Sequence, residues 1–328
     1  MHSPAARRKS MLPTETIRTL VEQACAAPSS HNTQPWLFRA HGAAIELWAD
    51  RTRALPVNDP FDRELTVSCG AALLSLRVAA AAAGFGARVD LLPEGPGSDW
   101  LARIEIANGA PEAGLAPLAE ALRRRRTYRK AFENRPVPED VMWAVEQAVA
   151  AEGAALVTLA GESRQQAAEL VADGDRLQWD DPRWRRELAM WMHPRRAGDG
   201  LSVPALAAPI AQAVVRTFDL GQGVAAKDQQ LATASPWLGV LITVQDDALA
   251  WLNAGQALQR ALLVGCQLGL QASYLNQPIQ VAVLRPRLQA VAGTAGHPQL
   301  LIRWGYSGDV LPAASRRAVE AVLEFGAG

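Results

Sequence analysis

Cysteine is scarce in this chain of 328 residues, and the three that occur, Cys25, Cys69 and Cys266, are far apart. None belongs to a Cys-x-x-Cys pair, and no histidines cluster near them. This spacing argues against a disulfide framework and against a metal site. Each cysteine stands in an apolar helical pattern, so we expect small core residues in a reducing compartment.

An excess of one charge sign is also missing, because 33 Lys and Arg residues balance 33 Asp and Glu residues. The overall field therefore favours neither nucleic acid nor an anionic membrane, and any basic patch must be local. No uninterrupted apolar run approaches the roughly 20 residues that span a bilayer. Residues 1–10 are basic, but no apolar stretch follows them, which argues against a secretory signal. We expect a soluble, cytoplasmic protein.

Two internal echoes indicate a duplicated architecture. The helical heptapeptide Val-Glu-Gln-Ala-Cys-Ala-Ala at residues 21–27 returns at residues 145–151 with one substitution. Residues 68–86 are echoed by residues 253–271, where small and apolar residues follow the spacing of a buried helix. Small residues let two helix backbones approach closely. Both copies end in a glycine at the expected helix C-terminus, which predicts caps at Gly84 and Gly269.

Strands are expected around these helices, at residues 37–40, 44–49, 102–107, 237–244 and 298–305. The linker 108–114 is rich in glycine, proline and other breakers, and it separates the two copies. We therefore place the boundary between an N-terminal half, residues 1–117, and a C-terminal half, residues 118–328.

The two echoes are spaced differently, so the second half must carry an insertion, and residues 173–209 are the candidate. This segment contains Trp179, Trp184 and Trp191 and is punctuated by glycine and proline. Aromatic residues need a surface to cover. The segment is interpreted either as a lid over a pocket or as a helical excursion packed on the core.

The most polar stretch is Pro-Ser-Ser-His-Asn-Thr-Gln-Pro-Trp at residues 28–36, between a predicted helix at 17–26 and the first strand. One interpretation is an ordered turn whose side chains satisfy their own backbone. The stretch also resembles the flavin-contacting loop of nitroreductase-family flavoproteins. In that family the loop crosses a dimer interface to FMN, which is bound mainly by the other subunit.

The densest basic cluster is Arg123-Arg124-Arg125-Arg126-Thr127-Tyr128-Arg129-Lys130. A charge run is usually a solvated helix end, but Arg-Arg-Thr-x-Arg is similar to the nitroreductase phosphate motif. Guanidinium groups match phosphate oxygens bidentately, and a hydroxyl adds one donor. Arg316 and Arg317 resemble the family's second basic contact, with ordinary surface arginines as the alternative.

The resemblance extends over nearly the entire chain. Further matching runs lie at residues 59–65, 68–73, 183–188 and 298–306. Together they are similar to the Acg-type branch, in which two nitroreductase-like halves are fused. The resemblance implies an α+β fold in which mixed, mainly antiparallel sheets are flanked by helices and two tandem halves form a monomeric pseudo-dimer.

The resemblance also implies one complete FMN site for each chain, because each half keeps the motif that the other lacks. The first half holds the polar loop and the second holds the phosphate motif. Residues 273–278 occupy the family's position near flavin N5, although Leu275 and Asn276 replace the usual glycine-containing pair; a polar helix-to-strand turn is the alternative. The expected FMN contacts are Ser29, Ser30, Asn32, Gln34, Arg125, Arg126, Thr127, Arg129, Leu275, Asn276, Arg316 and Arg317.

Two functions remain open at this stage. The first is an FMN-dependent oxidoreductase in which NAD(P)H or another donor reduces the flavin, which then reduces a nitro, quinone or related small-molecule acceptor. The second is a protein that only binds or stores FMN under a closed lid. A nucleic-acid-binding module built on the basic cluster is a weaker third, because no recognised motif accompanies it. No catalytic acid or base stands out, and His31 is interpreted as a hydrogen-bonding loop residue.

Overall fold

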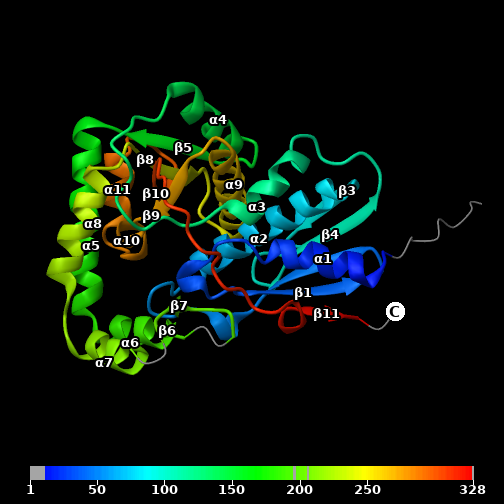
Figure 1. Ribbon diagram of the computed structural model, residues 1–328, viewed down its shortest axis with the longest axis horizontal. Coiled ribbons are helices and arrows are strands. Elements are labelled where there is room, and N and C mark those ends of the chain that lie inside the picture. Colours follow the sequence, from blue (N-terminus) through cyan, green and yellow to red (C-terminus); the bar gives the residue numbers. More distant parts are fainter. Residues whose placement is uncertain (1–11, 195–196, 205–206, 327–328) are drawn as a thin grey trace, which may run out of the picture.

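A computed structural model describes residues 12–194, 197–204 and 207–326 of the chain. Residues 1–10, on which the expectation of no secretory signal rests, lie outside the described residues. Four positions of the expected insertion, 195, 196, 205 and 206, also lie outside them. Two larger sheets lie side by side, with the long helices α2 (Arg63–Ala82) and α9 (Ala248–Gln267) between them (Figure 1).

The first sheet has the strand order β11-β1-β2-β4-β3. Its strands are β1 (Trp36–His41), β2 (Ala44–Ala49), β3 (Phe85–Leu91), β4 (Trp100–Asn108) and β11 (Leu323–Phe325). Neighbours are antiparallel except β1 and β11, which pair in parallel with Phe38 opposite Leu323. The end of the chain therefore crosses from the second sheet to complete the first one (Figure 1).

The second sheet has the antiparallel order β5-β8-β10-β9. Its strands are β5 (Ala155–Leu159), β8 (Trp237–Thr243), β9 (Gln271–Tyr274) and β10 (His297–Gly305). A short parallel pair, β6 (Met192–His193) and β7 (Leu201–Ser202), lies apart from both sheets. The strands expected from the sequence are confirmed, and so is the α+β class with mainly antiparallel sheets.

Helices cover both sheets and form an arm on one side (Figure 1). Besides α2 and α9, they are α1 (Thr14–Ala24), α3 (Ala119–Arg124), α4 (Glu139–Ala150), α5 (Gly161–Asp180), α6 (Pro182–Trp191), α7 (Ala208–Thr217), α8 (Gly221–Thr233), α10 (Gln277–Gln280) and α11 (Arg285–Val291). The predicted caps are confirmed, because Gly84 and Gly269 each follow a long helix with φ near +82°. This left-handed conformation favours glycine.

Helices α2 and α9 cross at a glycine contact. A Cβ atom built on Gly70 would overlap the carbonyl oxygen of Leu252, and one on Gly255 would overlap that of Val67. The expected close approach of the two small-residue helices is therefore confirmed. Among the described residues, α2 is the one helix long and apolar enough to span a membrane, but it lies buried within the protein core.

The expected insertion, residues 173–209, contains the end of α5, all of α6 and the β6–β7 pair. Trp179 and Trp184 are buried and pack edge to face with ring centroids 5.5 Å apart. The guanidinium of Arg53 lies over the ring of Trp191, and its central carbon Cζ is 5.5 Å from the ring centroid. The aromatic residues thus attach this segment both to itself and to the first half of the chain.

Candidate functional site

The polar loop 28–36 adopts a strained backbone. Ser30–Asn32 forms a 3₁₀ turn after α1, and His31, Asn32 and Gln34 have φ values of 48°, 55° and 53°. Asparagine and histidine adopt this left-handed region more often than most residues, whereas glutamine rarely does. The hydroxyl of Ser29 stabilises the turn by accepting the backbone N–H of Gln34 at 2.9 Å. Strain of this kind persists only where surrounding contacts impose it.

Two segments distant in sequence impose the conformation of the loop. The amide of Gln34 donates to the carbonyl of Gly198 at 2.9 Å and accepts the backbone N–H of Arg317 at 2.9 Å. Asn32 donates to the carbonyls of Gly200 and Ser315 at 3.4 and 3.3 Å. The β6–β7 segment and the C-terminal strand connection therefore both close onto the loop.

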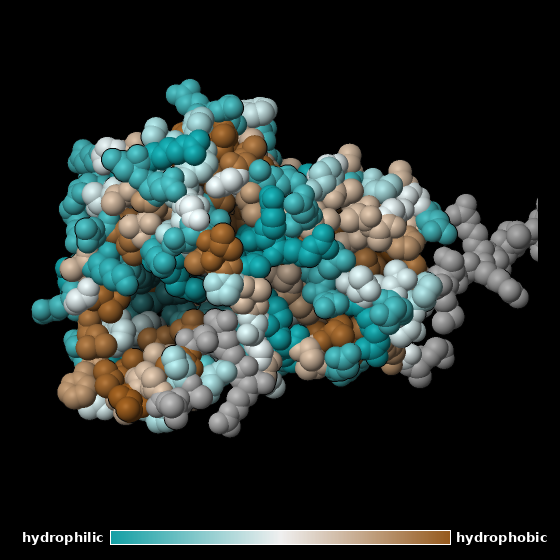
Figure 2. Space-filling model, in the orientation of Figure 1, coloured by the Kyte–Doolittle hydropathy of each residue, from teal (hydrophilic) through white to brown (hydrophobic). Residues whose placement is uncertain are grey.

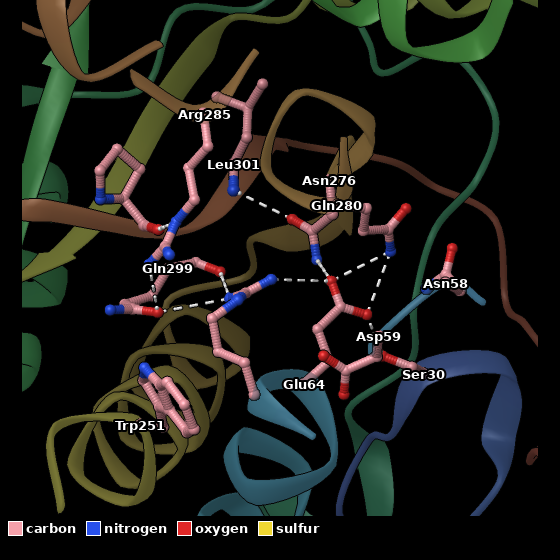
Figure 3. Close-up of polar contacts among 12 residues, drawn as sticks. Ser30, Asn58, Asp59, Glu64, Trp251, Asn276, Gln280, Arg285, Gln299 and Leu301 are labelled. Atoms are coloured by element: carbon pink, nitrogen blue, oxygen red, sulfur yellow. Dashed lines mark hydrogen bonds and ion pairs between the residues drawn. The ribbon is translucent and has the colours of Figure 1, made fainter. Parts of the chain in front are cut away.

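Ser30 points in another direction, toward a buried carboxylate. Its hydroxyl donates to Glu64 Oε2 at 2.7 Å, and Glu64, in the first turn of α2, is only 4% exposed. The amide of Gln280 donates to both oxygens of Glu64 at 3.0 Å. Figure 3 shows Glu64 between Ser30 on one side and the residues of α10 on the other.

Asn276 completes this cluster from the second half. Its Nδ2 lies 3.5 Å from Glu64 Oε1, while its Oδ1 accepts the backbone N–H of Leu301 at 3.0 Å (Figure 3). Leu275 is buried, and its N–H donates to the carbonyl of Leu301 at 2.9 Å. The structure thus brings together Ser30 and Asn276, two predicted flavin contacts from different halves, through a residue that was not predicted.

The basic segment contains a buried, incompletely paired arginine. Arg125 is 7% exposed, its Nη2 lies 3.4 Å from the carbonyl of Ala26, and its Nε and Nη1 are buried without a hydrogen-bond partner. Burial lowers the pKa of Arg125. The hydroxyl of Tyr274 is also buried, and burial raises its pKa, while the charges of Arg125 and Arg129 and the side chain of Thr127 act in the opposite direction.

The remaining basic residues have different surroundings. Arg129 is exposed, and Thr127 pairs with Ala272 in a short parallel bridge. Arg126 donates to the carbonyls of Arg123 and Arg125 at 2.7 and 2.8 Å. Its Nη1 is therefore engaged with its own segment, whereas its Nε is buried without a hydrogen-bond partner.

The two predicted basic clusters converge at the end of α1. Arg316 donates to the carbonyls of Cys25, Ala26 and Ala27 at 2.7, 3.1 and 3.1 Å. Arg125 reaches the same Ala26 carbonyl. A cation here complements the negative end of the helix dipole.

Arg317 diverges from this point toward the first sheet. Its guanidinium donates to the carbonyl of Gln34 at 3.0 Å and pairs with Asp50 at 3.4 Å.

Titratable groups around the cluster have perturbed pKa values. Burial lowers the pKa of His31 to about 4, so its imidazole is neutral near pH 7. Burial and the neighbouring charge of Glu64 raise the pKa of Asp59 to about 6. Burial and the charge of Asp228 raise the pKa of Asp175 to about 7, and the amide of Gln277 lies between these two carboxyls, at 3.1 and 2.9 Å.

The residues missed by sequence reasoning are Glu64, Gln280 and Tyr274. Each stood within or directly beside a run that was singled out, but only the structure shows that Glu64 and Gln280 meet. Among the described residues, no group of three or more His, Cys, Asp and Glu side chains could hold a metal ion. The surface is hollowed between α10 and the β6–β7 pair, and hydrophilic residues line the hollow (Figure 2).

Comparison with known proteins gives the relationships of the chain. No family model matches it. It is 34% identical to "Putative NAD(P)H nitroreductase Rv3131" of Mycobacterium tuberculosis, over 98% of this chain and 95% of that protein. It is 29% identical to "Putative NAD(P)H nitroreductase acg" of the same organism, over 95% of this chain and 96% of that protein.

Among solved structures, the FMN-dependent nitroreductase NfnB from Mycobacterium smegmatis in complex with NADPH aligns with a TM-score of 0.40 and 19% identity. That alignment covers 63% of this chain and 93% of NfnB. Because the 34% sequence identity with Rv3131 extends over nearly the full length of both chains, the protein belongs to the nitroreductase family.

Proposed function

We propose that this protein binds FMN and is an oxidoreductase of the nitroreductase type. In this role NAD(P)H or another donor reduces the bound flavin, which then reduces a nitro, quinone or related small-molecule acceptor. The names of the relatives at 34% and 29% identity support the reaction class and the nicotinamide donor. The expected fused pseudo-dimer, with halves 1–117 and 118–328 acting as a monomer, is part of the proposal.

The observation that carries the proposal is the buried, incompletely paired guanidinium of Arg125. Buried polar groups in proteins are nearly always hydrogen-bonded, so the two unpartnered nitrogens Nε and Nη1 indicate a missing acceptor. The buried hydroxyl of Tyr274, which lies within the electrostatic influence of Arg125 and Arg129 and interacts with Thr127, supplies a further donor. This donor set fits a phosphate group, and Thr127 and Arg316 would complete its binding site.

The ring and ribityl of FMN would lie against Ser29, Ser30, Asn32, Gln34, Leu275 and Asn276. FMN supplies the hydride chemistry when bound, and the protein's residues hold and orient it. His31 is neutral at pH 7, so it would act as a hydrogen-bonding group. The contacts of Asn32 and Gln34 with Gly198 and Gly200 support the interpretation of residues 173–209 as a lid.

The phosphate assignment is tested by titrating FMN into flavin-free protein carrying Arg125→Ala or Arg124→Ala. Arg124 belongs to the same basic run but is exposed and pairs with Glu120 at 3.2 Å. A charged hydrogen bond contributes about 1.5 to 3 kcal/mol, so Arg125→Ala should weaken FMN binding at least about tenfold. Arg124→Ala should bind like the wild type. Equal affinities in the folded variants, checked by circular dichroism, would contradict the assignment.

The same lid contacts favour a second function, FMN binding without turnover, because a segment closed over the loop restricts access of a donor. An anaerobic visible spectrum separates the two. Bleaching of the bound flavin by NADPH or NADH identifies a reductase. A flavin that resists both but bleaches with dithionite indicates storage or another donor, and a protein that cannot be loaded with FMN would refute the proposal.

A further inference from the structure

Glu64 is a buried carboxylate on which four donors converge. Ser30 and Gln280 donate at 2.7 and 3.0 Å, and Asn276 and Arg63 lie at 3.5 and 3.4 Å. In these four contacts the oxygens of Glu64 are the acceptors, and Figure 3 shows Ser30, Asn276 and Gln280 around them. Such a carboxylate fixes the positions of its donors, since each would otherwise lose its partner in a buried environment.

Three of these donors come from segments that are far apart in the sequence. Ser30 belongs to the strained loop of the first half, Asn276 is the residue before the single turn of α10 in the second half, and Gln280 is the last residue of that turn. Helix α10 is too short to be stable alone, so its position depends on such contacts. Glu64 itself is held rigidly, because it lies in the first turn of the buried helix α2.

We propose that Glu64 is a positioning residue of the flavin site, which fixes Ser30 and Asn276 relative to each other across the two halves. The inference rests on the proposed FMN function. A glutamine in place of Glu64 keeps the shape but replaces one acceptor by an NH₂ donor, which faces donors. Ser30 and Asn276 then lose the acceptor that they share, and their positions relative to each other, and so to FMN, are no longer fixed.

The charged and titratable groups that face Glu64 are Asp59 and Arg63 from α2 and its approach, and His31 from the loop. Asp59 accepts the backbone N–H of Leu65 at 2.8 Å, so it caps the helix while Glu64 points into the cluster. The N-terminus of α2 is therefore capped by Asp59, whereas the polar cluster is centred on Glu64. A substitution at Glu64 changes the cluster and leaves the cap of α2 in place.

Glu152 offers a matched control. It is comparably buried, with 6% side-chain exposure against 4% for Glu64, and it also joins the halves by pairing with Arg77 of α2 and Arg260 of α9 at 2.6 and 2.7 Å. In the part of the chain that the structure describes, the hydrogen bonds and ion pairs of its side chain go to Arg77 and Arg260, and neither of these is a predicted flavin contact. Glu152→Gln should therefore reduce stability without changing the affinity for FMN.

The experiment measures FMN affinity by fluorescence quenching in the full-length, flavin-free protein, for Glu64→Gln, Ser30→Ala, Asn276→Ala and the double variants. Glu64→Gln should weaken binding about tenfold or more, because one lost buried hydrogen bond to a charged group corresponds to at least that factor. In the Glu64→Gln background, Ser30→Ala and Asn276→Ala should each add less than their single effects. In the Glu152→Gln background, each of the same two substitutions should change the dissociation constant of FMN by the same factor as it does in the wild type.

The outcomes are distinct. Coupling in the Glu64 series, with independence in the Glu152 series, supports the proposal. Independent effects in both series overturn it even if Glu64→Gln binds weakly, because they would mean that Glu64 acts only on overall stability. A wild-type protein that binds no FMN overturns the proposed function, and the positioning role falls with it.

Discussion

The crossing of α2 and α9 leads to a quantitative prediction for Gly70→Ala. A methyl group on Gly70 would overlap the carbonyl oxygen of Leu252 and approach the Cα of Gly255 to 3.0 Å. The obstacles are backbone atoms of another helix, so no side-chain rotation can relieve them. The two helices must move apart along their shared core, which the protein interior resists because it is closely packed.

The magnitude follows from two opposing terms. Overpacking of a core costs about 1 to 3 kcal/mol, and rigid backbone obstacles favour the upper end of that range. Alanine returns about 1 kcal/mol through its higher helix propensity. We therefore expect Gly70→Ala to lower the free energy of unfolding by about 2 kcal/mol, measured by equilibrium denaturation with far-ultraviolet circular dichroism.

Gly223 provides the control for this prediction. It lies inside α8, and a Cβ atom there would meet nothing within 4 Å. Gly223→Ala should therefore stabilise the protein by up to about 1 kcal/mol. If the two variants unfold at the same denaturant concentration, the close glycine crossing does not exist, and the reasoning that connects the small-residue pattern to this packing is refuted.

Three further predictions concern buried carboxyl and imidazole groups. Burial and the charge of Asp228 raise the pKa of Asp175 to about 7, so the native state holds this proton more tightly than the unfolded chain does, and wild-type stability should fall as pH rises from about 4 to 7. Denaturation midpoints of Asp175→Asn, measured at pH 5 and 8, should lack this contribution. A decline as large as in the wild type would contradict the assignment. Burial lowers the pKa of His31 to about 4, so stability should fall as pH drops from about 6.5 to 4, and His31→Gln should remove that loss. Identical pH profiles of stability in the wild type and the variant would disprove the assignment. Glu187 accepts two backbone N–H groups of the loop before α2 at 2.8 Å, so Glu187→Gln should cost about 1 to 3 kcal/mol and speed hydrogen exchange in that loop, and unaltered exchange would rule this anchor out.

Much of the fold was predictable because the long elements carry strong periodic signals. The buried helices α2 and α9 were visible in the echo of residues 68–86 by residues 253–271, and their glycine caps followed from the same small-residue pattern. Strand β11 was not predictable. It has only three residues, Leu323–Phe325, and its partner β1 lies almost 300 positions earlier in the chain, so no local pattern reports the pairing.

The candidate site was predictable as a set of segments but not as an arrangement. Sequence motifs pointed to the loop, the basic run and residues 275–276. They did not point to Glu64, because a buried carboxylate is defined by the donors around it and these come from separate segments. The contacts of Arg316 with the last turn of α1 were likewise invisible in the sequence, since an arginine near a helix end and one near a phosphate have the same local pattern.

The strained loop shows why the site depends on the whole chain. His31, Asn32 and Gln34 have left-handed backbones, which cost on the order of 1 to 3 kcal/mol where the residue type does not favour them, as for Gln34, and contacts from distant parts of the chain help to offset that cost. The contacts that do so come from Gly198, 164 positions after Gln34, and from Arg317, 283 positions after it. The conformation of the loop therefore depends on residues far away in the sequence. Binding of a cofactor at this loop should be coupled to the same long-range contacts, because they hold the loop in the conformation that the cofactor would meet.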